Sequence, residues 1–337
     1  MNQNNKALLL INLGTPNRPT YSSVFRYLNQ FLSDKRVLDI PYIFRFILVK
    51  FIICPFRSLS SSKLYKSLWS KYNNQSPLKL YTKNIANKIS IKKPNLDVYF
   101  CMRYQKPSIK ETIQTILLKN PEELIILPLF PHYASSTTGS IFDEVNRELS
   151  RYWSVPKIRF IHQFYNHPQF INSWINNVNK YDINEYDKIL FSYHGLPNSH
   201  VNKIYNDKTC NDEECTASIT ENNKFCYKAT THATTRLISN KLDIAKDKTI
   251  TCYQSRLSKR WIQPFTDNVI RGLVNDGHKK ILVIAPSFTS DNLETIIEIG
   301  EEYKNLFMRL GGEKFDFVES LNDSEIWTNA LIDIMEG

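Results

Sequence analysis

The chain alternates between short apolar runs and longer stretches in which apolar residues recur at helical spacing. Eight runs are rich in Ile, Leu, Val and Phe without strict alternation, which is typical of parallel strands covered on both faces. These predicted strands are Ala7–Leu13, Val98–Met102, Leu124–Phe130, Ile158–His162, Ile189–Ser192, Thr249–Tyr253, Ile281–Ala285 and Phe315–Val318. The predicted helices between them include Pro107–Leu118, Asp143–Arg151, Gln169–Asn177, Thr230–Leu242 and Trp261–Asn275. This alternation predicts an α/β protein with parallel sheets.

Two passages suggest that the chain has two similar halves. Leu127–Ser140 and Val283–Thr295 each contain an apolar strand, a proline, a Ser/Thr-rich loop and the start of a helix. Such loops lie at the carboxyl ends of strands, where ligands bind in open α/β sheets. The length of 337 residues also suits two domains. We expect an N-terminal α/β domain over residues 1–164, a second over 165–305, and a tail, 306–337, that packs on the first.

Glycine content and charge narrow the function. The chain has nine glycines and lacks the G-x-G-x-x-G and G-x-x-x-x-G-K-[ST] motifs. A conventional dinucleotide fold or P-loop enzyme is therefore disfavoured, because both need glycine where the backbone meets phosphate. The net charge of +10 favours anionic partners, but the basic residues are dispersed. We therefore expect no nucleic-acid partner.

Apolar segments bear on localisation. No run of 18 uncharged apolar residues is present, so no transmembrane span is predicted. Ala7–Leu13 runs into a Gly-Thr-Pro turn without a cleavage site, which indicates a first strand and a cytoplasmic protein. Pro41–Phe56 is strongly apolar but interrupted by Arg45 and Lys50. It is either a core helix or an apolar lip that holds a flat ligand or rests on a membrane.

His194 is the first candidate for chemistry. It stands in Phe191–Pro197, just past the predicted carboxyl end of a buried strand. The neighbouring Gly195 lets the backbone or a ligand approach closely. Histidine titrates near neutral pH, so a functional role at this position is favoured over a structural one.

Acidic residues near the last strands form the second candidate site. Asp291 and Glu294 have the spacing of a capping box at a helix start. Glu294, Glu298 and Glu302 then recur every four residues, and like charges at this spacing destabilise a helix slightly. Two interpretations are open: a solvated acidic face, or a stripe along which a cation binds.

Six separate motifs together resemble the ferrochelatase family. They are Leu8–Pro16, Arg103-Tyr104, Tyr133–Ser140, Phe191–Pro197, Tyr253–Arg256 with Trp261, and Phe288–Glu294. They follow the family's order and span most of the chain. The resemblance implies two Rossmann-like domains without a nucleotide and a porphyrin cleft between them, the chelatase fold. It implies a lyase of haem biosynthesis that inserts Fe²⁺ into protoporphyrin IX, releasing two protons and giving protohaem in the terminal step.

The resemblance also implies roles for single residues. His194 matches the family's active-site histidine and Glu294 its facing acidic residue, so both are expected to handle the substrate Fe²⁺ and the leaving protons. Glu298 and Glu302 continue that acidic path as a relay. The expected porphyrin-binding residues are Leu13, Trp69, Ser76, Arg103, Tyr104, Trp261 and Phe288. Among them Arg103 and Ser76, with the hydroxyls of residues 135–138, suit propionates.

The cysteines depart from the family's pattern. Longer members hold a 2Fe-2S cluster on four cysteines in the segment after the histidine, and Cys210, Cys215 and Cys226 match three of these. Thr231 stands at the fourth position, where His232 or Cys252 are the substitutes to consider. A polar loop with leftover thiols is the favoured interpretation, and no resident cofactor is required. Cys54 and Cys101 lie in apolar surroundings and are expected to be buried.

Three other functions compete with this one. A cobalt chelatase of the same superfamily resembles this fold but tends to carry a second histidine where Glu294 stands. A porphyrin carrier needs tight axial ligation instead of a base facing an acid. A nucleic-acid binder is supported by the net charge alone. The choice between protoporphyrin and coproporphyrin, the oligomeric state and the strength of contact with a membrane surface stay open.

Overall fold

A computed structural model describes residues 6–205, 209–210 and 212–337 of the chain. These residues form two compact units, each with its own parallel sheet. The N-terminal unit contains the chain up to Phe130, residues 134–162 and Met335–Gly337. The C-terminal unit contains Pro131–Tyr133 and Gln163–Ile334. The two sheets confirm the predicted α/β class.

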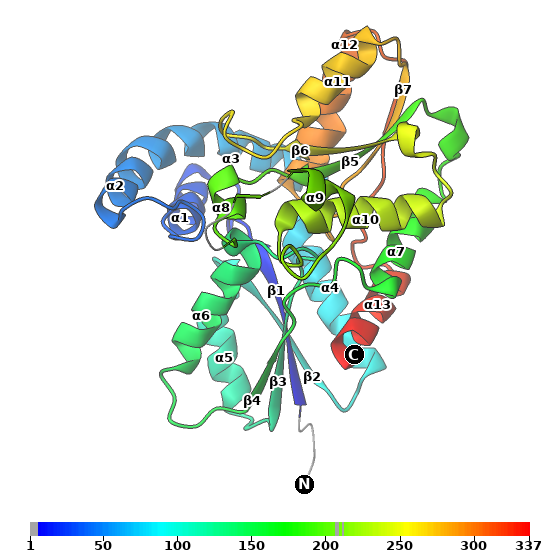
Figure 1. Ribbon diagram of the computed structural model, residues 1–337. Helices are drawn as coiled ribbons and strands as arrows, with labels where there is room; N and C mark the ends of the chain where they lie inside the picture. Colours follow the sequence, from blue (N-terminus) through cyan, green and yellow to red (C-terminus); the bar gives the residue numbers. More distant parts are fainter. Residues whose placement is uncertain (1–5, 206–208, 211) are drawn as a thin grey trace. The chain divides into compact units, whose positions relative to one another are not determined.

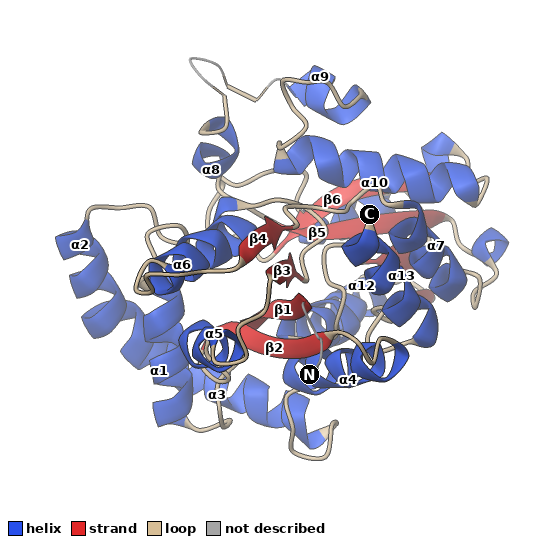
Figure 2. Cartoon of the chain, turned by 90° about the horizontal axis from the view of Figure 1, so that it is seen from below, coloured by secondary structure: helices blue, strands red, loops and turns tan. Residues whose placement is uncertain are grey.

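The sheet of the N-terminal unit has the strand order β2-β1-β3-β4, and all neighbours are parallel. Its strands are β1 (Lys6–Gly14), β2 (Asp97–Tyr104), β3 (Glu123–Pro128) and β4 (Lys157–Phe160). Figure 2 views this sheet end-on, with β4, β3, β1 and β2 following one another. Its helical segments are α1 (Tyr21–Leu32), α2 (Tyr42–Ile47), η1 (Leu48–Ile53), α3 (Cys54–Ser70), α4 (Pro77–Lys92), α5 (Ile109–Leu117), η2 (Ser135–Gly139) and α6 (Ser140–Leu149).

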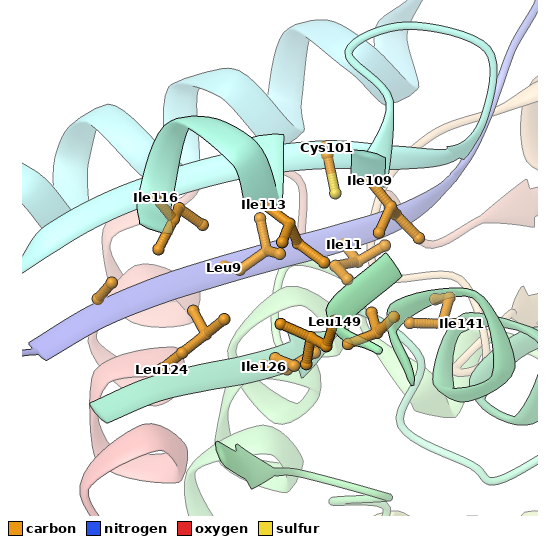
Figure 3. Packing of buried hydrophobic residues seen from close by; sticks show 12 residues of the cluster. Leu9, Ile11, Cys101, Ile109, Ile113, Ile116, Leu124, Ile126, Ile141 and Leu149 are labelled. Carbon is orange, nitrogen blue, oxygen red and sulfur yellow. The ribbon is translucent and has the colours of Figure 1, made fainter. Parts of the chain in front are cut away.

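Helices cover both faces of this sheet. Leu9 and Ile11 share one face of β1, because side chains alternate along a strand. They pack in one cluster with Ile113 of α5 and with residues of α6 (Figure 3). Leu8 and Leu10 point the other way and are equally buried, and α4 contacts β1 and β2. This burial on both faces explains why the strand is apolar without alternation.

The apolar segment 41–56 lies on the surface. It forms α2, η1 and the start of α3, and Tyr42, Phe44 and Phe56 are 71%, 67% and 72% exposed. The interpretation as a core helix is therefore wrong, and the segment is an exposed apolar surface. In the part of the chain that the structure describes, no helix has both the length and the apolarity needed to cross a membrane.

The sheet of the C-terminal unit has the order β6-β5-β7-β8, again with all strands parallel. Its strands are β5 (Lys188–His194), β6 (Thr249–Gln254), β7 (Lys280–Ile284) and β8 (Lys314–Phe317). In both sheets the first strand in sequence pairs with the second and the third, so the prediction of two similar halves is confirmed (Figure 1). The helical segments of the C-terminal unit are α7 (Pro168–Val178), η3 (Ile183–Glu185), α8 (Asn198–Asn202), α9 (Asp212–Ala217), α10 (Tyr227–Lys241), η4 (Lys246–Lys248), α11 (Thr266–Asn275), η5 (Glu294–Tyr303), α12 (Lys304–Arg309) and α13 (Glu325–Glu336).

Two parts of this unit differ from the sequence expectations. Residues 306–334 belong to the C-terminal unit and not to the N-terminal domain, because β8 pairs with β7 and Phe315 is buried in the core of this unit. Strands joined through a helix usually lie side by side in one sheet, which is what β7, α12 and β8 do. The helix predicted from Trp261 begins only at Thr266, since Trp261 forms a bridge with Pro197.

Candidate active site

His194 is the last residue of β5, at the carboxyl edge of the C-terminal sheet. Because β6 and β7 flank β5, the loops after three neighbouring strands meet at this edge. The hydroxyl of Ser287, which follows β7, accepts a hydrogen bond from the backbone N–H of His194 at 3.4 Å. The Tyr227 hydroxyl donates to the carbonyl of His194 at 3.0 Å. The backbone of His194 is thus held from two sides.

The imidazole of His194 has a defined tautomer. Its Nδ1 lies 2.7 Å from the carbonyl oxygen of Gly195. A carbonyl oxygen can only accept a hydrogen bond, so Nδ1 carries the hydrogen and Nε2 of the neutral ring carries the lone pair. The side chain is half-buried. This form of the ring can accept a proton or bind a metal ion through Nε2.

Gly195 allows this edge to be closely packed. A Cβ at residue 195 would lie 2.8 Å from the carbonyl oxygen of Gln254 and 3.2 Å from Cε3 of Trp261. The N–H of Gly195 donates to the same Gln254 carbonyl at 2.8 Å. The rings of Trp261 and Phe288 lie 6.4 and 6.2 Å from the His194 ring, measured between centroids. Two of the predicted porphyrin-binding residues therefore flank His194.

Glu294 is not part of a helix cap. The backbone N–H of Thr295 donates to the Asn292 side chain at 3.0 Å, and the N–H of Asn292 donates to the Thr295 hydroxyl at 2.9 Å. This reciprocal cap lies one residue after the predicted box of Asp291 and Glu294, so that prediction was wrong in register. Asp291 instead accepts a hydrogen bond from Asn322 at 2.8 Å. Glu294, the first residue of η5, is free of a capping role.

The surroundings of Glu294 favour its neutral form. Burial raises the pKa of Glu294, the charge of His194 opposes this rise, and the charge of Glu298 adds to it. His194 and Glu294 are thus close enough for their charges to interact. A carboxyl group of this kind can exchange a proton nearer to neutral pH than an ordinary glutamate.

The carboxyl group of Glu298 is held by three hydrogen bonds. Its Oε1 accepts hydrogen bonds from the backbone N–H of Ser255 at 2.9 Å and from the Tyr303 hydroxyl at 2.8 Å. Its Oε2 accepts one from the Ser255 hydroxyl. Ser255 follows β6 and has a φ of 63°, in the left-handed region that few non-glycine residues adopt. Three donors on one carboxyl group fix its position at this edge of the sheet.

The third residue of the stripe is more open. Glu302 is exposed, and partial burial followed by the charges of Glu298 and Glu301 raises the pKa of its carboxyl group. All three predicted residues lie on η5, which has π-helical hydrogen bonding. Such segments are rare and occur frequently at functional sites. The three residues thus differ: the pKa of Glu294 is raised by burial, Glu298 is held by hydrogen bonds, and Glu302 is exposed.

Arg103 and Tyr104 lie at the end of β2, in a polar network of the N-terminal unit. Arg103 pairs with Asp34 at 2.7 Å, and the Tyr104 hydroxyl donates to the same carboxylate at 2.8 Å. Ser140 donates to Asp34 at 2.5 Å. Glu144 lies 3.5 Å from Arg103. The Arg103 guanidinium thus already has two carboxylate partners. The sequence analysis, which assigned Arg103 to a propionate, did not predict them.

The other predicted porphyrin-binding residues of this unit vary in exposure. Leu13 is half-buried near the carboxyl end of β1. Trp69 is buried near the end of α3. Ser76 is buried and caps α4, accepting a hydrogen bond from the Lys79 N–H at 3.4 Å. A helix cap is thus a structural role that Ser76 fulfils in the absence of any ligand.

Three thiols converge in the C-terminal unit. The Sγ atom of Cys210 lies 3.3 Å from that of Cys215 and 3.8 Å from that of Cys226. Among the described residues, this is the one group of three or more His, Cys, Asp or Glu side chains whose ligand atoms all lie within 4.8 Å of one another. The three cysteines of this segment thus meet at one place in the fold, and Cys215 and Cys226 are buried there. Cys54 and Cys101 are buried, as predicted.

Some of the site's residues were missed by the sequence analysis. Asp34, Tyr205, Ser255 and Tyr303 were not proposed as site residues, although Ser255 lies in one of the recognised motifs. Asp34 and Tyr303 make contacts with residues remote in sequence or across a helix turn, which a single sequence does not reveal. A serine directly after a strand end was the available signal for Ser255.

The chain is similar to known proteins over nearly its whole length. A family model described as Ferrochelatase matches residues 5–337. A Ferrochelatase of Legionella pneumophila is 39% identical over 332 residues, covering 98% of each chain. A Ferrochelatase of Coxiella burnetii is 38% identical over 338 residues, covering 98% of this chain and 93% of that protein.

Solved structures support the fold. SirB from Bacillus subtilis has a TM-score of 0.55 at 11% identity, covering 98% of this chain and 94% of its own. CbiX, described as the terminal enzyme for siroheme biosynthesis in denitrifying bacteria, has a TM-score of 0.51 at 9% identity, covering 98% of both chains. At this identity the likeness concerns the chelatase fold. By its family model and its relatives, the chain belongs to the ferrochelatase family.

Proposed function

We propose that this protein inserts Fe²⁺ into protoporphyrin IX, releasing two protons and giving protohaem, in the terminal step of haem biosynthesis. Family membership supports the reaction class. The observation that carries the assignment of residues is the pairing of His194, whose neutral ring has its lone pair on Nε2, with Glu294, whose pKa is raised by burial. An imidazole and a carboxyl group are side chains that can transfer protons in a reaction.

The chemistry requires a proton acceptor and a weak metal ligand. A free-base porphyrin loses two N–H protons as the metal enters; Nε2 of His194 accepts one of them and passes it on before it accepts the second. Fe²⁺ must also be released to four pyrrole nitrogens. Imidazole and carboxylate ligands suit this transfer better than thiolates, which bind iron more firmly. His194 and Glu294 are of the suitable kind.

Glu298 and Glu302 extend this pair along η5. Three hydrogen bonds hold the carboxyl group of Glu298 in place, and carboxylate oxygens are ligands that divalent cations accept. The exposed Glu302 lies towards solvent. We assign to Glu298 and Glu302 the path by which iron arrives or protons leave.

We retain the seven predicted porphyrin-binding residues on family resemblance. Trp261 and Phe288, beside His194, offer aromatic surface to a flat ring. Leu13, Trp69 and Tyr104 belong to the N-terminal unit and are assigned to the porphyrin on family resemblance. Arg103 and Ser76 are retained as propionate partners on family resemblance, and Arg103 is the one whose contacts with Asp34 and Glu144 compete with that role.

We assign peripheral contact with a membrane to the exposed apolar segment 41–56 of a cytoplasmic enzyme. Tyr42, Ile43, Phe44 and Phe56 are each at least two-thirds exposed, and Arg45 and Lys50 lie among them. Apolar side chains with interspersed basic residues suit an anionic bilayer surface. Phe44→Glu is expected to reduce sedimentation with anionic vesicles, whereas Leu118→Glu, an exposed control 83% accessible, is not. Equal sedimentation of both variants and wild type would contradict the assignment.

The reaction is tested with purified protein, Fe²⁺ and protoporphyrin IX without oxygen. Loss of porphyrin fluorescence together with the appearance of a haem spectrum is the expected result. Coproporphyrin is tested in parallel, because the two substrates differ in side chains alone. No turnover of either porphyrin by protein of native fold would overturn the proposal, and turnover of coproporphyrin alone would replace the substrate.

A further inference from the structure

The three converging thiols lie in the C-terminal unit and have no role in the proposed reaction. Cys215 and Cys226 are buried and Cys210 is half-buried. The three come from different segments: Cys210 precedes α9, Cys215 lies within it, and Cys226 caps the start of α10. The Sγ atom of Cys210 lies 3.3 Å from that of Cys215 and 3.8 Å from that of Cys226, so that one metal ion could contact all three.

The spacing of the sulfurs fits one metal ion. Thiolates at about 2.3 Å from a tetrahedral Zn²⁺ are roughly 3.8 Å apart. The three Sγ atoms here all lie within 4.8 Å of one another. In a 2Fe-2S cluster each iron has two protein ligands, so ligands on different irons are further apart by the iron–iron separation. Three sulfurs this close therefore fit a single ion better than two irons.

The fourth ligand of a cluster is also lacking in the described part of the chain. Thr231 is buried and bonds to the Tyr253 hydroxyl at 2.9 Å. Cys252 belongs to the apolar core of the C-terminal unit and accepts a hydrogen bond from Thr266 at 3.4 Å. Neither Cys252 nor His232 is in the group of converging ligand atoms. The residues present thus do not fit a cluster held by four protein ligands.

We propose that Cys210, Cys215 and Cys226 bind a single thiophilic divalent cation, such as Zn²⁺, with its fourth position open to an exchangeable ligand. Thiolate ligands select ions of this class. Three protein ligands and one open position are sufficient for tetrahedral coordination of zinc.

Neighbouring residues support the three ligands. The Tyr205 hydroxyl lies 3.1 Å from Sγ of Cys215. The backbone N–H of Cys210 donates to the Asn202 side chain at 3.1 Å. The N–H of Cys226 donates to the carbonyl of Asn223, a buried residue, at 2.7 Å. Such contacts around the ligands orient them for the metal, and Tyr205 is a positioning residue of the site.

Co²⁺ serves as the spectroscopic probe. The full-length protein is reduced, freed of metal and titrated with Co²⁺ in the His194→Ala background, which removes metal binding at the proposed active site. We expect thiolate-to-cobalt charge-transfer bands and the visible bands of tetrahedral Co²⁺, saturating at one ion per chain. Zn²⁺ is expected to displace the cobalt and abolish the bands.

Variants identify the ligands. Cys215→Ser and Cys210→Ser are each expected to abolish the bands, whereas the control Cys101→Ala retains them. Tyr205→Phe is expected to weaken binding about tenfold while the bands remain. If Cys215→Ser does not fold, as judged by circular dichroism, Cys210→Ser with its half-buried side chain decides the case.

Three results would overturn the proposal. The first is iron and inorganic sulfide in equal amounts, two of each per chain, after anaerobic purification. The second is a protein that binds no Co²⁺ after reduction of a disulfide between Cys210 and Cys215. The third is a cobalt spectrum that Cys215→Ser and Cys210→Ser leave unchanged.

Discussion

The two units share a sheet order but differ in the surroundings of one acidic side chain each, Asp34 in the N-terminal unit and Glu294 in the C-terminal unit. In the N-terminal unit, burial alone would raise the pKa of Asp34. Hydrogen bonds from Ser140, the Arg36 backbone and Tyr104, with the charge of Arg103, outweigh burial and lower that pKa. In the C-terminal unit, burial dominates and raises the pKa of Glu294. The first carboxylate is fully paired, and the second is left protonatable.

This difference separates a structural carboxylate from a functional one. A carboxylate with several donors and an arginine contributes to stability and exchanges its proton at acidic pH alone. A buried carboxyl group with few partners is costly for the fold but can take part in proton transfer. The comparison thus predicts which substitutions change activity and which change stability.

The largest expected effect is that of His194→Ala on activity. Removal of the proton acceptor is expected to lower kcat/KM for Fe²⁺ insertion about 10³-fold. Turnover is followed by porphyrin fluorescence without oxygen, and circular dichroism checks the fold. His278→Ala, at the opposite edge of the same sheet before β7, is the control. Near-normal turnover of His194→Ala would exclude His194 as the acceptor.

Asp34→Asn is expected to have the next largest effect, on stability. The change leaves the Arg103 charge, 11% exposed, without its nearest partner, and breaking such a buried pair costs about 3 kcal/mol of unfolding free energy. Urea denaturation measures this loss. Asp97→Asn, which breaks an exposed pair with Lys119, is the control and is expected to cost less than about 1 kcal/mol. Equal losses in both variants would contradict the account of the network.

Glu294→Gln is expected to lower kcat about 10²-fold, because the amide fills the same space but exchanges no proton. The same fluorescence assay applies. Glu301→Gln, on the same helical segment but outside the stripe, is the matched control. A Glu294→Gln enzyme with the turnover of the control would remove Glu294 from the reaction.

The pH dependence of stability is expected to have opposite signs for the two carboxyl groups. The pKa of Asp34 is lowered on folding from its ordinary value of 3.8, so its contribution is present above that pH and is lost as pH falls. The pKa of Glu294 is raised from 4.5, so its contribution is present at low pH and is lost as pH rises through the folded value. Glu294→Gln is therefore expected to stabilise the protein at pH 7 and Asp34→Asn to destabilise it. Denaturation at pH 4 and pH 7 measures the change in unfolding free energy that each substitution causes. Changes of the same sign at pH 7 in both variants would contradict the comparison.

The smallest expected effect is that of Ser255→Ala. It removes one hydroxyl donor from Glu298 and leaves the backbone donor, so Glu298 is held less firmly. We expect about a tenfold higher KM for Fe²⁺ with a smaller change in kcat. Ser258→Ala, exposed in the same loop, is the control. An unchanged KM would show that Glu298 does not act on the metal.

The fold was largely predictable from sequence because burial on both faces makes parallel strands uniformly apolar. All eight predicted strands form, with ends that differ by one or two residues. The surface helices were harder to predict: α2, η1 and the start of α3 are apolar yet largely exposed, so hydrophobicity alone left a core helix as one interpretation. The sequence analysis treated residues 306–337 as a tail and did not predict that β8 pairs with β7.

The candidate site was predictable where chemistry follows a strand end, as at His194. The capping register was not, because Asn292 with Thr295 competes with Asp291 and Glu294 for the same role within one residue. The carboxylate partner of Arg103 comes from a segment remote in sequence, and a single sequence does not show that the two meet. The three cysteines, in contrast, were grouped in advance through the family resemblance.

The central claim is that the fold raises the pKa of Glu294, so that this residue takes up and releases a proton at a higher pH than an ordinary glutamate. Infrared difference spectra of wild type against Glu294→Gln, recorded over a pH series, isolate the carboxyl band of this residue. The account predicts a protonated Glu294 that titrates clearly above 4.5, the ordinary pKa of a glutamate. A band that titrates at or below 4.5 would contradict it.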